Sequence, residues 1–333
     1  MAHKAFISGC ASTALTDDER SFFADERPWG LILFARNCET KEQVSDLVEA
    51  FRFATDSPTA PVLIDQEGGR VQRLGPPHWP SYPSPGRIAK ALNGHLAGLD
   101  VFRAHGRLLA SDLDELGITV DCVPCADLLQ PDGHKIISDR AFGSVPKLVA
   151  ERAWAQTEGL MDGGVLPVLK HMPGHGRATV DSHLELPVVS TPRPQLDETD
   201  FAVFKALGPH FHLGMTAHVV FSDIDPENPA TLSARVISDV IRAHIGFDGL
   251  LMTDDLSMKA LGGDFDDRTR RALEAGCDIV LHCNGDMDEM QAVASAVPDL
   301  AGRSLERANT ALASRGRAQA FNRADAEAAI AVA

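Results

Sequence analysis

The chain lacks the charge pattern of a nucleic-acid binder. Its 333 residues carry 31 lysines and arginines against 47 aspartates and glutamates, a formal net charge of −16. Proteins that bind polyanions usually show a basic excess, so we expect no nucleic-acid partner. No apolar run approaches the ~20 residues that cross a bilayer. We therefore expect no membrane association either.

We expect neither a leader sequence nor a disulfide framework. The first ten residues contain no long apolar segment before a small-residue cleavage site, so we expect a first strand there and not a signal peptide. The six cysteines lie in or beside apolar runs, which favours free, buried thiols in a reducing cytoplasm. Cys122 and Cys125 have redox or zinc spacing, but no second pair accompanies them, and we assign them neither role.

Strand-like apolar runs recur eight times and alternate with charged segments of helical spacing. The runs are Ala5–Gly9, Gly30–Phe34, Ala60–Ile64, Ile118–Pro124, Val165–Leu169, Leu213–Val220, Gly249–Thr253 and Cys277–Cys283. The helical segments are Thr40–Ala54, Leu96–Leu116, Lys147–Asp162, Asp197–Leu207, Ser233–His244, Asp267–Ala275, Asp286–Val297 and Ser304–Phe321. Alternation predicts an α/β fold with a parallel sheet, and eight repeats predict a closed (β/α)8 barrel. A doubly wound open sheet is the alternative, but the glycine-rich turn after its first strand is absent.

A linker between domains is missing as well, so we expect residues 1–333 to form a single catalytic barrel. Arg73–Pro85, with five prolines, is the nearest candidate for a linker. It follows the third strand at the end where Asp65 lies. We interpret it as a stiff loop beside a functional site.

Charged side chains gather where four predicted strands end. Lys170–His183 follows one apolar run, and Asp254 and Asp255 follow another. Asp65 and His218 end two more. Because the carboxyl ends of parallel strands meet at one face of a barrel, these residues predict a site there.

Two pairs of neighbouring residues carry the strongest chemical signal, one of two aspartates and one of an aspartate and a histidine. Asp254 and Asp255 are adjacent, so on an extended backbone only one of them can face the barrel mouth. Asp181 lies two residues before His183, where a carboxylate can orient the imidazole and raise its pKa. Taken alone, both aspartates could cap helices or pair with arginines, and His183 could be a surface histidine.

The same strand ends offer groups that hold a polar ligand. Lys170, Arg73 and Arg140 are cations that can bind hydroxyls or carboxylates, and Asp65 can accept hydrogen bonds from two vicinal hydroxyls. The alternative for each is an ordinary salt bridge on a loop. His171 and His175 are four residues apart but lack the glutamate of the zinc-protease pattern.

Six segments together resemble glycoside hydrolase family 3, specifically its single-domain bacterial β-N-acetylglucosaminidases of the NagZ type. They occur in the family's order: Ile64–Arg73, Ser138–Gly143, Lys170–Gly176, Asp181–His183, Met215–His218 and Met252–Met258. The resemblance implies that Asp254 is the nucleophile and that His183, with Asp181, is the acid/base. It implies that five residues bind the N-acetylglucosamine ring: Asp65, Arg73, Arg140, Lys170 and His171.

The resemblance also implies a reaction and a substrate. A retaining exo-β-N-acetylglucosaminidase would use Asp254 to attack the anomeric carbon while His183 protonates the leaving oxygen. The expected substrate is N-acetylglucosamine linked to 1,6-anhydro-N-acetylmuramic acid, with or without peptide, in cytoplasmic cell-wall recycling. We expect a monomer without cofactor or metal.

Three alternatives remain open on the sequence. A neutral imidazole does not repel anions, so phosphate could replace water and make the enzyme a phosphorylase. A metal-dependent hydrolase would use His171, His175, His183 and an aspartate, although their spacing does not fit common zinc sites. A non-catalytic sugar-binding barrel would not need Asp254 or the pair of Asp181 and His183.

Overall fold

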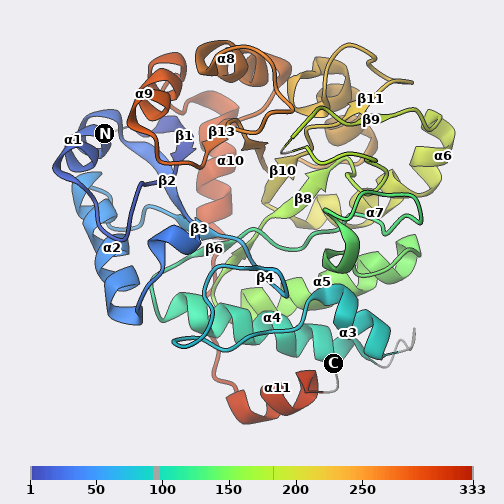
Figure 1. The fold of residues 1–333 in the computed structure, drawn as a ribbon, viewed down its shortest axis with the longest axis horizontal. Helices are drawn as coiled ribbons and strands as arrows, with labels where there is room; N and C mark the ends of the chain where they lie inside the picture. The colour runs from blue at the N-terminus through green and yellow to red at the C-terminus, as the bar shows by residue number, and fades with distance from the viewer. Residues whose placement is uncertain (1, 93–97, 183, 332–333) are drawn as a thin grey trace.

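The computed structural model describes residues 2–92, 98–182 and 184–331. Nine short strands form one sheet in the order β7-β6-β3-β2-β1-β13-β12-β10-β8, in which neighbouring strands run parallel (Figure 1). They are β1 (Lys4–Ser8), β2 (Pro28–Leu33), β3 (Val62–Ile64), β6 (Val120–Asp121), β7 (Leu166–Pro167), β8 (Leu169–Met172), β10 (Leu213–Thr216), β12 (Leu250–Asp255) and β13 (Ile279–His282).

The two edges of this sheet belong to one interrupted strand. Only Val168 separates β7 from β8, and its N–H donates to the carbonyls of Asp121 (3.1 Å) and Val123 (2.8 Å). β7 pairs with β6 while β8 pairs with β10, so the sheet closes on itself. The predicted (β/α)8 barrel is confirmed, and each of the eight predicted runs contributes one position around it.

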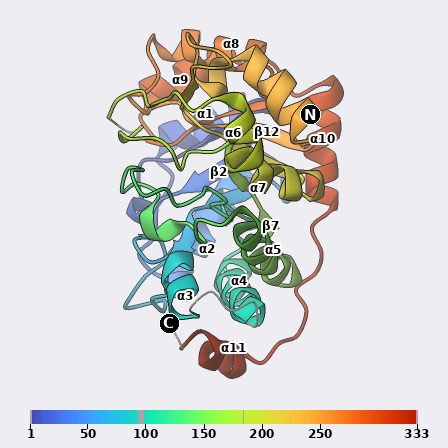
Figure 2. The same ribbon diagram turned by 90° about the vertical axis from the view of Figure 1, so that its right-hand side faces the viewer.

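Helices surround the barrel, as the two views in Figures 1 and 2 show. They are α1 (Asp17–Glu26), α2 (Lys41–Ala54), α3 (Pro85–Ala91), α4 (Leu99–Asp114), α5 (Pro146–Asp162), α6 (Arg193–Glu198), α7 (Asp200–Leu207), the π-helix η6 (Val236–His244), α8 (Phe265–Ala275), α9 (Met287–Ala296), α10 (Gly302–Ala313) and α11 (Arg323–Ile330). In the described part of the chain, no helix is long and apolar enough to cross a membrane.

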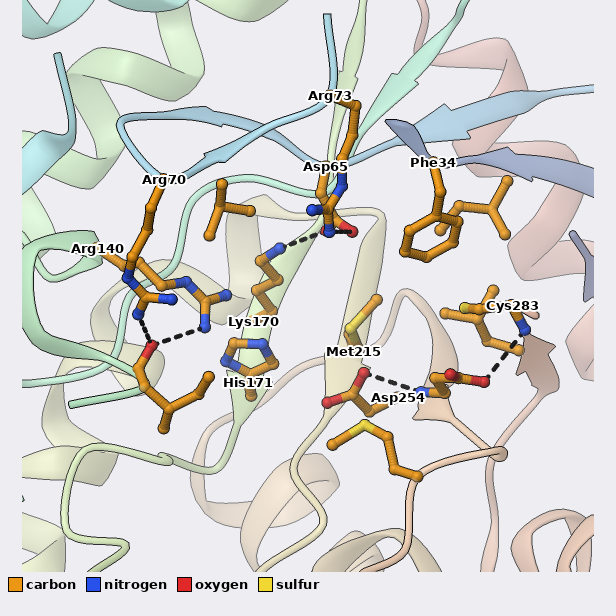
Figure 3. A pocket seen from close by; sticks show the side chains of 16 residues that line it. Phe34, Asp65, Arg70, Arg73, Arg140, Lys170, His171, Met215, Asp254 and Cys283 are labelled. Atoms are coloured by element: carbon orange, nitrogen blue, oxygen red, sulfur yellow. Dashed lines mark hydrogen bonds and ion pairs between the residues drawn. The ribbon is translucent and has the colours of Figure 1, made fainter. Parts of the chain in front are cut away.

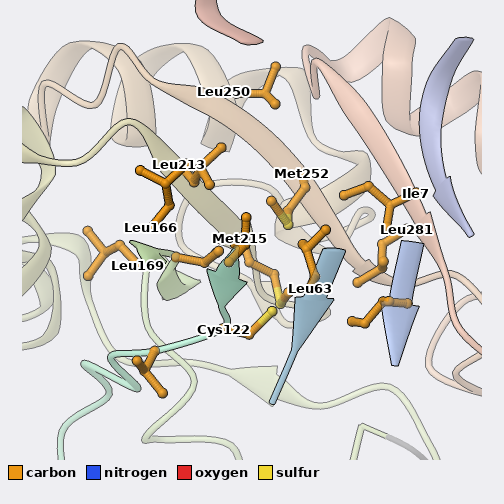
Figure 4. Close-up of a cluster of buried hydrophobic side chains, with 14 of the residues drawn as sticks. Ile7, Leu63, Cys122, Leu166, Leu169, Leu213, Met215, Leu250, Met252 and Leu281 are labelled. Atoms are coloured by element: carbon orange, nitrogen blue, oxygen red, sulfur yellow. The ribbon is translucent and has the colours of Figure 1, made fainter. Parts of the chain in front are cut away.

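Inward-facing apolar side chains from strands all around the sheet fill the barrel (Figure 4). None of the ten labelled residues is more than 3% exposed: Ile7, Leu63, Cys122, Leu166, Leu169, Leu213, Met215, Leu250, Met252 and Leu281. Burying a side chain of this size contributes roughly 1.5–3 kcal/mol. The barrel interior is therefore a packed core, and a ligand can enter only at its ends.

Some helix boundaries differ from the sequence-based predictions. The predicted helix Ser304–Phe321 is wrong beyond Ala313, because the chain leaves the helix there and Arg315 Nε donates to the carbonyl of Gly164. The predicted helix Asp197–Leu207 is replaced by α6 and α7, which meet at Thr199. Short helices α1, α3 and α11 were not predicted.

Helix α2 begins where it was predicted, directly after Thr40, which caps it. Thr40 Oγ1 accepts from the Gln43 N–H at 3.2 Å. The side chain of Gln43 accepts from the N–H of Glu39, at 2.9 Å.

All six cysteines are free thiols, and five of them are buried.

Two small strand pairs and the proline-rich segment follow the carboxyl ends of the barrel strands. β4 (Gln66–Gly68) and β5 (Val71–Gln72) form an antiparallel hairpin directly after β3. β9 (Val188–Val189) pairs with β11 (Val220–Phe221). The proline-rich segment then runs to Pro85, which begins α3, and its Trp79 is only 4% exposed.

Candidate active site

A cavity of about 280 Å³ opens at the carboxyl ends of the strands. Its lining combines six of the predicted site residues, contributed by segments far apart in the chain: Asp65, Arg73, Arg140, Lys170, His171 and Asp254. Figure 3 shows Lys170 and His171 in the middle of this pocket, with Arg140 on one side and Asp254 on another. The structure thus brings together residues that the sequence only marked as strand ends.

We expected Lys170 and His171 to follow the end of a strand. In the structure they lie within β8. Lys170 Nζ contacts Asp65 Oδ1 at 2.8 Å and Glu67 Oε1 at 2.7 Å, and its side chain is almost fully buried. A buried ammonium requires such partners. The strand can therefore continue through two polar residues because each finds its partners at the barrel's end.

Glu67 joins two cations of the pocket. The guanidinium of Arg140, from the 3₁₀ turn η3 (Ser138–Arg140), donates to both Glu67 oxygens at 2.7 and 2.8 Å. Arg73 donates from Nη2 to Asp65 Oδ2 at 3.0 Å. The result is one connected array of three cations and two carboxylates, most of it removed from water.

The charges in this array hold one another ionised. Burial alone would raise the pKa of Glu67, but Arg140 and Lys170 outweigh it and bring the pKa down to about 2. Burial likewise opposes ionisation of Asp65, and Lys170 and Arg73 lower its pKa well below the usual range. The pKa of Lys170 is raised, because Asp65 and Glu67 overcome its desolvation. At neutral pH the array presents fixed donors and acceptors.

His171 is oriented by the carboxylate of Asp127, which lies in the segment after β6. Its Nδ1 lies 2.7 Å from Asp127 Oδ2, and Asp127 is completely buried. Because Nδ1–H donates to the carboxylate, Nε2 is left to face the pocket. Burial raises the pKa of Asp127, but His171 and then His175 outweigh this effect and lower it to about 2.

The two adjacent aspartates of β12 have different surroundings. Asp255 Oδ1 accepts from the backbone N–H groups of Ser257 (3.0 Å) and Cys283 (3.1 Å), and Oδ2 accepts from Ser257 Oγ. Asp254 accepts at Oδ1 from the N–H of Asp255 at 2.8 Å, and its carboxylate faces the cavity (Figure 3). Both aspartates line the cavity, but the carboxylate of Asp255 fixes the loop after β12 through these hydrogen bonds, so Asp254 is the candidate for contact with a ligand.

The predicted acid/base pair is only partly described. His183 lies outside the described residues. Asp181 is partly exposed, and its carbonyl accepts from the N–H groups of Leu184 (2.9 Å) and Glu185 (3.0 Å). Ser182, the residue after Asp181, is buried, and its Oγ lies 3.0 Å from His175 Nε2.

One group of described residues has the composition of a metal site. Ligand atoms of Cys125, Asp127 and His171 lie within 4.8 Å of one another. Burial raises the pKa of the Cys125 thiol well above its usual value. Cys125 Sγ donates to Asp127 Oδ2 at 3.3 Å. The set fits a hydrogen-bonded cluster better than a metal site.

The metal-hydrolase alternative would need His171 and His175 to converge on one ion. Their ring centroids are 5.7 Å apart, but each ring is committed elsewhere, to Asp127 and to Ser182. The only candidate ligand group found among the described residues does not include His175. The geometry therefore gives this alternative no support.

Sequence reasoning missed Glu67 and Asp127, which orient the predicted groups. Both carry a signal that could have been used, because each follows a predicted buried strand by a few residues, as Asp65 does. Arg70 also lines the cavity, and its Nε lies 3.5 Å from Asp139 Oδ1.

Comparisons with known proteins agree on one family. The profile of the glycosyl hydrolase family 3 N-terminal domain matches residues 8–312. A β-hexosaminidase of Alkalilimnicola ehrlichii is 38% identical over 297 residues, 88% of this chain and 84% of that protein. A β-hexosaminidase of Aromatoleum aromaticum is 37% identical over 314 residues, 92% of this chain and 86% of that protein.

A solved structure gives the same result in three dimensions. The crystal structure of NagZ from Neisseria gonorrhoeae in complex with N-trifluoroacetyl-D-glucosamine superposes with a TM-score of 0.87 at 29% identity. The match covers 99% of this chain and 97% of the other. The similarity extends through the barrel and the loops at its carboxyl end.

Proposed function

The chain belongs to glycoside hydrolase family 3 and is a β-hexosaminidase of the NagZ type, and from this we propose that it removes non-reducing terminal β-N-acetylglucosamine by a retaining mechanism. The observation that carries the proposal is the position of Asp254 in one pocket with Asp65, Lys170 and Arg140. A carboxylate that faces a set of fixed hydroxyl-binding groups suits attack on a bound sugar ring.

The proposed nucleophile is Asp254. Its carboxylate attacks the anomeric carbon, a C–O bond forms, and the bond to the leaving oxygen breaks. His183 donates its proton to that oxygen, so the aglycone leaves as an alcohol. In the second step the neutral His183 takes a proton from water, the water oxygen attacks the anomeric carbon, and Asp254 leaves as a carboxylate with the β configuration restored.

The proposed sugar-binding groups are the buried array and His171. Asp65 offers acceptor lone pairs to vicinal hydroxyls, while Lys170, Arg73 and Arg140 donate. Because Asp65 and Glu67 stay ionised far below neutral pH, these donors and acceptors keep their roles during turnover. The Neisseria NagZ complex with a glucosamine derivative supports a sugar of this type.

The proposed natural substrate is N-acetylglucosamine linked to 1,6-anhydro-N-acetylmuramic acid, with or without peptide. Such a fragment is recycled from the cell wall, so the proposed compartment is the cytoplasm. We propose that residues 1–333 act as one catalytic domain and as a monomer. Gel filtration coupled to light scattering tests the last point.

The first test is release of 4-nitrophenol from its β-N-acetylglucosaminide by the wild type, Asp254→Ala and His183→Ala. We expect activity in the wild type, near-total loss in Asp254→Ala and partial loss in His183→Ala. Glu42→Ala, which changes an exposed carboxylate on α2, is the control and should retain full activity. An inactive wild type, or turnover by Asp254→Ala, would overturn the proposal.

The same assay in phosphate buffer tests the phosphorylase alternative. The hydrolase releases free N-acetylglucosamine, whereas a phosphorylase releases the 1-phosphate. Mass spectrometry of the product distinguishes the two. We expect the free sugar to predominate.

A further inference from the structure

Ser182 is buried, and in the chain it stands between Asp181 and His183, the proposed acid/base pair. It is 2% exposed, whereas Asp181 before it is partly exposed and His183 follows it directly in the chain. Its Oγ lies 3.0 Å from His175 Nε2, and its carbonyl accepts from the N–H of Ala260 at 3.2 Å. Two contacts from different parts of the barrel thus hold this position of the loop.

His175 is itself held by the residue that orients the sugar-binding histidine. Its backbone N–H donates to Asp127 Oδ1 at 2.5 Å, and Asp127 Oδ2 accepts from His171 Nδ1 at 2.7 Å. His171, His175 and Asp127 are all more than nine-tenths buried. An unbroken series of hydrogen bonds therefore connects the sugar-binding His171 to Ser182.

The chemistry of His175 fits a structural donor and does not fit an acid or base. Burial, reinforced by the nearby His171, lowers the pKa of His175 to about 4, so the ring is neutral at ordinary pH. Its Nδ1 is buried and bonds to nothing among the described residues. An unpaired acceptor is tolerated more often than an unpaired N–H. The proton therefore belongs on Nε2, which donates to Ser182 Oγ.

We propose that the hydrogen bond between His175 and Ser182 is a positioning contact for the proposed proton transfer. It fixes Ser182, the residue before His183 in the chain, relative to His171, and we expect protonation of the leaving oxygen to depend on it. The inference rests on the proposed function. Neither His175 nor Ser182 touches the substrate in this scheme.

The test compares two leaving groups in Ser182→Ala, His175→Leu and the double variant. 4-Nitrophenol leaves with little protonation, whereas methanol needs it, so the first step should suffer more for the methyl glycoside. We expect kcat/KM to fall at least ~10-fold more for the methyl than for the 4-nitrophenyl N-acetylglucosaminide. The double variant should be no slower than the worse single variant, because both remove one contact.

Two further variants separate positioning from a general loss of structure. His175→Gln can still donate from its amide to Ser182 Oγ, and it should recover most of the methyl glycoside activity that His175→Leu loses. Ser190→Ala, an exposed serine on the same loop, is the matched control and should behave as the wild type. Circular dichroism spectra and thermal midpoints of all variants accompany the kinetics.

Three outcomes would overturn the inference: equal losses for both glycosides, additive losses in the double variant, or no recovery in His175→Gln. Each would mean that the two residues act through stability or sugar binding. A wild type that cleaves neither glycoside would instead refute the proposed function. The two failures are therefore distinguishable in one set of assays.

Discussion

The backbone N–H of Asp255 donates a hydrogen bond to the Oδ1 of Asp254 at 2.8 Å. This contact sets the nucleophile candidate against the cavity while the carboxylate of Asp255 accepts from Ser257 and Cys283 on its other side. Adjacent residues with the same chemistry thus have separate roles. Both residues line the pocket, and the hydrogen bonds that Asp255 accepts distinguish their roles.

Exchanging each aspartate for its amide separates these roles. Asp254→Asn should lower kcat/KM for the 4-nitrophenyl glycoside more than ~1,000-fold, as the loss of a nucleophile does in other enzymes. Its thermal midpoint should hardly change. Asp255→Asn should lose about 1–3 kcal/mol of stability, because it weakens the partly buried hydrogen bonds from Ser257 and Cys283, and should retain more activity than Asp254→Asn. Steady-state kinetics measures the loss of activity, and urea unfolding measures the loss of stability. Equal losses of kcat/KM in the two variants would contradict the assignment of Asp254 as the nucleophile.

Glu67→Gln should destabilise the protein in a pH-dependent way. Removing one charge from a buried array costs about 3–5 kcal/mol at pH 7. The pKa of Glu67 is lowered to about 2 in the folded protein, so its contribution is fully present above its ordinary pKa of 4.5. It is lost as pH falls through about 2. The difference between wild type and Glu67→Gln should therefore shrink between pH 4.5 and pH 2.

Urea unfolding at pH 7, 4 and 3 measures this difference. Glu185→Gln removes an exposed carboxylate and should show no such dependence. A gap between Glu67→Gln and the wild type that stays constant from pH 7 to pH 3 would show that Glu67 is not held ionised by Lys170 and Arg140.

Asp65→Asn should act on sugar binding more than on folding. Lys170 keeps Glu67 at 2.7 Å. Arg73 loses the Asp65 carboxylate, but its side chain is partly exposed to water and can still donate to the amide oxygen of the asparagine. Hydrogen bonds from hydroxyls to a charged group contribute about 1.5–3 kcal/mol each, which corresponds to a KM raised roughly 10- to 150-fold. Steady-state kinetics separates KM from kcat. A fall in kcat with unchanged KM would contradict a role in ground-state binding.

Gly159→Ala should destabilise the barrel by distorting the contact between α4 and α5. A Cβ on Gly159 would lie 1.9 Å from the carbonyl oxygen of Arg103, a backbone atom that cannot move alone. Overpacking of this kind costs about 1–3 kcal/mol or more. Gly316→Ala, with nothing within 4 Å of its added Cβ, is the control. Thermal denaturation measures both, and equal midpoints would argue against close helix packing.

The barrel could be predicted because its signal is periodic and local. Each apolar run between charged segments supplied one strand position, and the closure followed from counting them. The division of Val165–Met172 into β7 and β8 could not be predicted, because it depends on hydrogen bonds from Val168 to Asp121 and Val123 on another strand. The break between α6 and α7 at Thr199 likewise depends on tertiary contacts, since Arg177 bonds to Thr199 and Asp200.

The site was predictable to the extent that each residue carries its own chemical signal. Asp65, Lys170, His171 and Asp254 were found at strand ends, and the resemblance to a family assigned their proposed roles. Glu67 and Asp127 were missed because their importance lies in which cations and histidines they meet. Such pairings join positions 44 and 73 residues or more apart in the chain, and no local pattern records them.

The shared carboxylate of Glu67 has a thermodynamic consequence. Lys170 and Arg140 are among the side chains with the most rotamer freedom, and folding has already immobilised both around one acceptor. A sugar that enters the pocket therefore meets side chains that are already ordered. Its binding does not include the entropy cost of immobilising them. If Glu67 no longer held these side chains, sugar binding would have to immobilise them. The weaker binding would then appear in calorimetry as a less favourable entropy at nearly unchanged enthalpy.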